Sequence, residues 1–77
     1  MIEMTPVQSS NIHAVGYDLH SQTLSVQFKA RGGAAAGSIY EYIAVPPEVY
    51  ERFMNAPSKG GWFAANIKNH YAARRAQ

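Results

Sequence analysis

The segment 23–28, TLSVQF, alternates polar and apolar residues without a break, and this pattern constrains the fold more than any other feature. Successive side chains of a β-strand point to opposite faces, so Leu24, Val26 and Phe28 share one apolar face. A single strand of this kind cannot bury that face alone. The segment therefore predicts an antiparallel sheet that is covered on one side.

Two further segments predict strands on either side of it. Residues 11–18 contain the β-formers Ile12, Val15 and Tyr17, and a polar turn over 19–22 follows them. Residues 39–45 form the third strand. Its alternation places Tyr40 and Tyr42 on one face.

The opposite face of the third strand is expected to carry Ile39, Ile43 and Val45 together with Glu41, so both faces hold bulky side chains. The preceding stretch, Arg31 to Ser38, is rich in glycine and alanine. Its composition predicts a long, flexible hairpin loop.

Two helices should follow. Pro46 and Pro47 stop the third strand, and Pro47 suits the first position of a helix over 47–55. In that helix the apolar residues recur at helical spacing: Val49, Tyr50, Phe53 and Met54.

Ser58 is an expected N-cap for the second helix, although Gly60 and Gly61 weaken its first turn. The four-residue spacing of Phe63, Ile67 and Tyr71 predicts one helical face, and Lys68, Ala72 and Arg75 predict another. On this basis the second helix runs to the end of the chain.

The sequence thus predicts one α+β domain over residues 1–77, a three-stranded antiparallel β-meander followed by two α-helices packed on one face (β-β-β-α-α), with a core over 8–72 and frayed termini. The absence of cysteine argues against a disulfide framework and favours a cytoplasmic location. Charged residues interrupt every apolar stretch, so no membrane association is expected.

Several short motifs, in this order, resemble the KTSC domain. They are the runs SSNI (9–12), VGYD (15–18), LxVxF (24–28), YxY (40–42), VP (45–46), VY (49–50), AxSxG (56–60), and Phe63 followed by Ile67 and Tyr71. The resemblance covers residues 8–72. Members of this family stand alone in bacterial and phage proteins or at the C-terminus of some lysyl-tRNA synthetases. That linkage implies RNA binding, and residues 31–38 read as an insertion relative to the family.

Charge is distributed unevenly. The net charge of +2 divides into −2 over residues 1–57 and +4 over residues 58–77, which contain no acid. We therefore expect Lys68, Arg74 and Arg75 to give the last helix a cationic end. They either contact phosphate or form an ordinary solvated helix end.

Aromatic residues supply a second set of candidates. Side chains two apart on a strand lie about 7 Å from each other, so Tyr40 and Tyr42 suit stacking on successive bases. Tyr17 would extend the same face. The alternative is that all three tyrosines fill the core.

The junction of the two helices is the third candidate. Ser58, Lys59, Gly60 and Trp62 would bring a hydroxyl, an ammonium group, free backbone N–H groups and an indole to a helix N-terminus, which suits a phosphate. The alternative is a routine N-cap and a tight corner.

Catalysis and metal binding have little support. The carboxylates are scattered without an adjacent acid–base pair, and no serine stands in a nucleophile motif. His13, His20 and His70 are dispersed, without metal-ligand spacing. We expect no enzyme activity, no metal and no cofactor.

The leading hypothesis is therefore a small binding module for RNA or another phosphate-bearing ligand. One alternative is a homodimer or higher oligomer, encoded by a phage or mobile element, that captures a small nucleotide signal or a host protein. Another is a protein-binding adaptor that exposes Tyr50, Met54 or Trp62 as an apolar patch.

Overall fold

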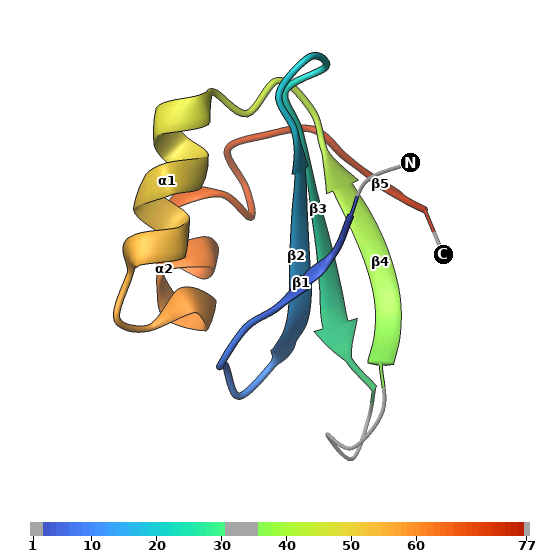
Figure 1. Cartoon of the computed structure of the whole chain (residues 1–77), viewed down its shortest axis with the longest axis vertical. Helices are drawn as coiled ribbons and strands as arrows, with labels where there is room; N and C mark the ends of the chain where they lie inside the picture. The colour runs from blue at the N-terminus through green and yellow to red at the C-terminus, as the bar shows by residue number, and fades with distance from the viewer. Residues whose placement is uncertain (1–2, 31–35, 77) are drawn as a thin grey trace.

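In the computed structural model, two helices cover one face of a five-stranded antiparallel sheet (Figure 1). The structure describes residues 3–30 and 36–76. The elements in chain order are β1 (Thr5–Pro6), β2 (Ile12–Asp18), β3 (Thr23–Lys29), β4 (Ala36–Tyr42), α1 (Pro47–Asn55), α2 (Lys59–Asn66) and β5 (Ala73–Arg75). None of the helices in these ranges is long and apolar enough to cross a membrane.

The α+β class and the three central strands are confirmed, while the count of three strands is corrected to five. Strand order in space follows the chain, β1-β2-β3-β4-β5. β2 pairs with β3 and β3 with β4 over most of their lengths. The two added strands are short and lie at the edges.

The predicted second helix is too long. α2 ends at Asn66, and residues 73–75 instead pair with β4 as β5. Two backbone hydrogen bonds extend this pairing, from Ile43 N to Ala72 O (2.9 Å) and from Ala76 N to Ile39 O (2.8 Å). Asparagine is a weak helix former and β4 offers an unpaired edge, so the chain leaves the helix and completes the sheet.

The third strand also differs from its prediction. It begins at Ala36 and ends at Tyr42. Residues 36–38 of the expected 31–38 loop therefore belong to the strand, and residues 31–35 lie outside the described residues.

The expected placement of Val45 on the face of Ile39 and Ile43 is wrong. Ala44 adopts a left-handed φ of 58°, which turns the chain and buries Val45 completely on the helix side.

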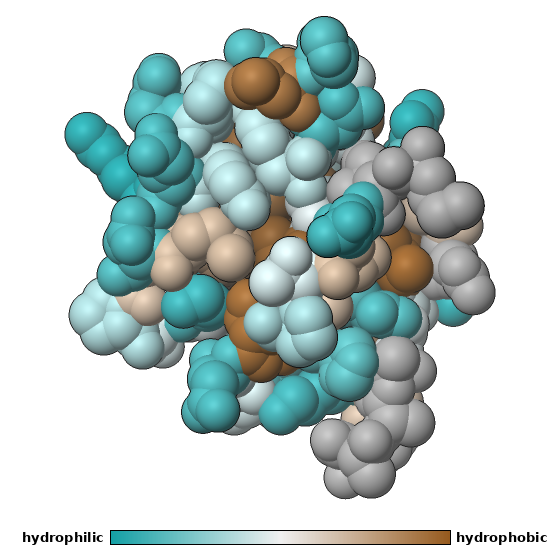
Figure 2. Space-filling model, viewed as in Figure 1, coloured by the Kyte–Doolittle hydropathy of each residue, from teal (hydrophilic) through white to brown (hydrophobic). Residues whose placement is uncertain are grey.

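The core lies between the helices and the inner face of the sheet. Its fully buried side chains come from β2, β3 and α1 and from the segments that follow β4 and α2: Ile12, Val15, Leu24, Val26, Val45, Phe53 and Ile67. In the view of Figure 2, hydrophobic surface shows in separate small patches at the top, the right and the centre of the molecule, and most of the remaining surface is hydrophilic or intermediate. The apolar face of β3 is therefore the covered face, as its alternation predicts.

Phe53 carries the packing of α1, because it is fully buried and its ring lies 6.1 Å from Trp62 and 6.2 Å from Phe63. Truncating a buried phenylalanine to alanine costs about 3–5 kcal/mol, comparable with the ~3–5 kcal/mol that one core of this size supplies. We expect Phe53→Ala to be largely unfolded at 25 °C by circular dichroism. Leu19→Ala, at the exposed β2–β3 turn, should stay within about 0.5 kcal/mol of the unmodified chain in urea denaturation. A folded Phe53→Ala would contradict this account.

Candidate functional site

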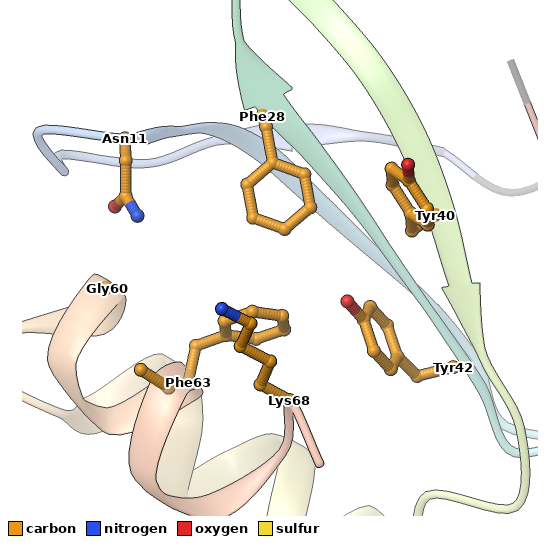
Figure 3. A pocket seen from close by; sticks show the side chains of 8 residues that line it. Asn11, Phe28, Tyr40, Tyr42, Gly60, Phe63 and Lys68 are labelled. Carbon is orange, nitrogen blue, oxygen red and sulfur yellow. The ribbon is translucent and has the colours of Figure 1, made fainter. Parts of the chain in front are cut away.

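A pocket of about 350 Å³ opens between α2 and the inner face of the sheet (Figure 3). Four segments of the chain meet there: the approach to β2, strand β3, strand β4, and α2 with the turn after it. The lining residues are Asn11, Phe28, Tyr40, Tyr42, Gly60, Phe63, Ala64 and Lys68. No acidic side chain is among them.

Aromatic rings form its walls in edge-to-face contact. The ring centroids of Phe28 and Tyr40 lie 6.0 Å apart, those of Phe28 and Phe63 5.5 Å apart, and those of Tyr42 and Phe63 5.2 Å apart. Such contacts hold aromatic rings in fixed orientations. The pocket therefore presents preformed apolar surfaces.

The tyrosine face of β4 meets the helices, which decides between the two sequence interpretations. Tyr42 is only 5% exposed and belongs to the core, so an open stacking platform does not describe it. Tyr40 is half-buried on the pocket wall. In Figure 3 the Tyr42 hydroxyl points into the pocket, so the ring is core while its polar end remains part of the site.

Gly60 brings α2 close to the sheet. A Cβ at this position would collide with Oδ1 of Asn11, and it would also approach Oγ of Ser9 at 3.5 Å. The glycine that looks unfavourable for helix propensity is needed for this close approach. Neither Asn11 nor Phe28 was among the predicted site residues, although both stand in the motifs that resemble the KTSC pattern.

The helix junction acts mainly as a structural corner. Ser58 is the N-cap of α2, as predicted, and its Oγ accepts a hydrogen bond from Gly61 N at 3.3 Å. The Lys59 ammonium group donates to Ala56 O at 3.5 Å, and the half-buried Trp62 packs on Phe53. Of the four residues predicted here, only Gly60 lines the pocket.

Tyr17 lies away from the pocket. Its ring stacks on Tyr50 with centroids 4.5 Å apart, and its hydroxyl donates to Val45 O. Tyr50, Met54 and Trp62 are all half-buried against the core. This packing counts against the exposed patch that the adaptor hypothesis requires.

The basic residues separate onto different surfaces rather than forming a helix end. Lys68 follows α2 and points its ammonium group into the pocket in Figure 3. Arg75 pairs with Tyr40 across β4 and β5, and its guanidinium donates to Ser38 Oγ at 3.1 Å. Arg74 points to the other face, where it forms an exposed ion pair with Glu41 at 2.7 Å. Of the predicted cations, only Lys68 lines the pocket.

Burial raises the pKa of Tyr42 above its ordinary value of 10.0, and the neighbouring Tyr40 adds to the effect. Burial also raises the pKa of Tyr17, with smaller contributions from Glu48 and Asp18. Both hydroxyls are therefore neutral at physiological pH. In the pocket, the Tyr42 hydroxyl can donate or accept a hydrogen bond.

The first site prediction concerns Gly60. Gly60→Ala should destabilise the domain by about 1–3 kcal/mol, because the new methyl group collides with the Asn11 side chain. Gly61→Ala is the matched control, since its nearest obstacle is the Ser58 hydroxyl at 3.1 Å and alanine favours the helix. Urea denaturation of both variants checks this. If Gly60→Ala proved as stable as Gly61→Ala, the close approach of Gly60 to Asn11 would be unimportant for stability.

Alkaline pH should destabilise the domain through the buried hydroxyl of Tyr42. A raised folded-state pKa of Tyr42 stabilises the domain below about pH 10, and this contribution is lost as pH rises through the folded-state value. Tyr42→Phe should therefore lose less stability between pH 8 and pH 11 than the unmodified chain in urea titrations. Tyr71→Phe, outside the pocket lining, is the control. Identical pH dependence of Tyr42→Phe and the unmodified chain would contradict the prediction.

Comparisons with known proteins agree on one family. A lysine–tRNA ligase of Nostoc punctiforme is 41% identical over 64 residues, covering 83% of this chain but only 10% of the ligase. An uncharacterized protein of Stutzerimonas stutzeri is 39% identical over 66 residues, 84% of each chain. The crystal structure of a KTSC domain protein from Yersinia pestis superposes with a TM-score of 0.87 at 34% identity and covers 100% of both chains. The KTSC domain family model matches residues 8–71, and the chain belongs to the KTSC domain family.

Proposed function

We propose that this domain is a non-catalytic RNA-binding module that holds one unpaired nucleotide in the pocket between α2 and the sheet. The observation that carries the proposal is the combination of aromatic walls with a lysine and without a carboxylate. Proteins bind unpaired bases by stacking them on aromatic side chains, and they bind the attached phosphates with cations.

The size and shape of the pocket fit one nucleotide rather than a duplex. Its volume of about 350 Å³ is at the small end of ligand pockets. Phe28, Tyr40 and Phe63 meet edge to face, so the rings offer surfaces of different orientation to one planar base. A double helix would keep its bases stacked and out of reach.

Two cations extend the site toward a phosphate backbone. Lys68 enters the pocket, and Arg75 lies beside Tyr40 on the same side of the sheet. The partner of Arg75 is the neutral Ser38 hydroxyl, so its charge is not cancelled there. Arg74, by contrast, pairs with Glu41 and contributes little net charge.

The polar groups of the pocket favour binding over catalysis. They are an amide, an ammonium group and two phenols, without an acid–base pair placed to transfer a proton. Three of the relatives are named lysine–tRNA ligase, and a module carried by proteins that act on tRNA supports RNA as the partner. The same pocket geometry supports a free mononucleotide as the second candidate.

Fluorescence anisotropy tests the proposal with a labelled single-stranded oligoribonucleotide, tRNA and a duplex of the same length in 50 mM salt. We expect the single strand to bind and the duplex to bind more weakly. The affinity should fall with added salt as for about two phosphate contacts, which gives a slope near −1.4 when the logarithm of the association constant is plotted against the logarithm of the salt concentration. Absence of binding at high micromolar protein overturns the RNA proposal, and a mononucleotide titration then tests the second candidate.

Paired lysine variants locate the site. Lys68→Ala should weaken binding about tenfold, since it removes a hydrogen bond from a charged donor. Lys59→Ala removes the same charge from a residue outside the pocket lining and should change the Kd little. Equal effects of the two substitutions would show that binding depends on overall charge and not on the pocket.

A further inference from the structure

The Asn11 side chain enters the pocket in a fixed orientation. Ser9 Oγ accepts backbone N–H groups from Asn11 at 3.4 Å and Ile12 at 3.3 Å, so its own hydrogen is available to donate. It donates to Oδ1 of Asn11 at 3.1 Å. Gly60 packs against the same oxygen. The oxygen end of the amide is therefore engaged by the protein.

The nitrogen end of the amide is left for a ligand. In Figure 3, Asn11 turns Nδ2 toward the pocket, and Nζ of Lys68 enters the same space from the turn after α2. Neither an amide N–H nor an ammonium group can accept a hydrogen bond. This side of the pocket consequently presents donors only.

Resting on the proposed function, we propose that the pocket prefers guanine among unpaired bases, with Asn11 Nδ2 and Lys68 Nζ donating to its N7 and O6. Guanine is the base that presents these two acceptors next to each other on one edge. Asn11 is then a specificity-determining residue, while the aromatic walls stack any base.

Adenine is disfavoured for a structural reason. Asparagine usually reads adenine with both amide ends, accepting from N6 and donating to N7. The Ser9 hydrogen bond and the packing of Gly60 hold Oδ1 away from the position of guanine O6, which Lys68 Nζ contacts. The N6 amino group of adenine would take that position and would face the ammonium group, a donor, rather than an acceptor. Adenine therefore forms one hydrogen bond where guanine forms two, and this difference lets the pocket distinguish the two bases.

The ligand-side experiment uses nonamers of uridine that carry one central guanine, adenine or 7-deazaguanine, with the all-uridine strand as reference. We expect guanine to bind at least about fivefold more tightly than adenine, and 7-deazaguanine, which lacks N7, to lose most of that advantage. Equal affinity for all three purines overturns the guanine preference and leaves the proposed function standing. Failure of every strand to bind overturns the proposed function itself.

Protein variants test the orientation of the amide. Ser9→Ala frees Oδ1, so the amide can rotate, and the ratio of guanine to adenine affinity should fall toward one while overall binding persists. Asn11→Asp removes the donor and should also abolish the preference. Asn55→Asp makes the same charge change on α1, where the Asn55 amide contacts Glu51 O, and should leave the ratio unchanged.

Thermal melting by circular dichroism confirms which variants are folded. An unchanged ratio of guanine to adenine affinity in folded Ser9→Ala and Asn11→Asp would overturn the assignment of Asn11. If either variant does not fold, the nonamer series with the unmodified protein decides the question alone.

Discussion

Val45 links the sheet to the helices, and the arrangement of the two layers depends on it. Its side chain is fully buried, its N–H donates to Gln22 O at 2.8 Å, and its carbonyl accepts from the Tyr17 hydroxyl. The left-handed φ of Ala44 directs the chain into this position. A non-glycine residue in that region is strained by about 1–3 kcal/mol, so the surrounding contacts must hold it there.

This junction decides which face of β4 is covered. Pro46 and Pro47 begin α1 immediately after Val45, so α1 and then α2 lie over the face that carries Tyr40 and Tyr42. Ile39 and Glu41 remain on the opposite face. The pocket lies where the helices leave Phe28 and Tyr40 only half-buried beside the buried ring of Tyr42.

Local patterns predicted the elements whose signals are local. The alternation of 23–28, the proline at the start of α1 and the Ser58 cap all appear as expected. β5 was missed because its three residues have no distinctive pattern and form a strand only by pairing with a distant segment. The position of Val45 was missed because a single left-handed residue reverses the alternation that sequence reasoning assumes.

The pocket was predicted only in parts. Tyr40, Tyr42, Gly60 and Lys68 were singled out for separate reasons, and the structure brings these four together. Asn11 was not singled out as a site residue, because the sequence shows it only as the first residue of the strand predicted over 11–18 and as part of the SSNI motif. Its proximity to Gly60 depends on how α2 docks against the sheet, which periodicity does not specify.

The edges of the sheet have a consequence for behaviour at high concentration. β1 has only two residues, one of them Pro6, which has no N–H to offer another strand. β5 has three residues, two of them arginines. Short edges that carry proline or charge are poor templates for strands from other molecules. A sheet whose central strand carries one apolar face can thus remain dispersed in a crowded solution, because its edges give neighbouring chains little to extend.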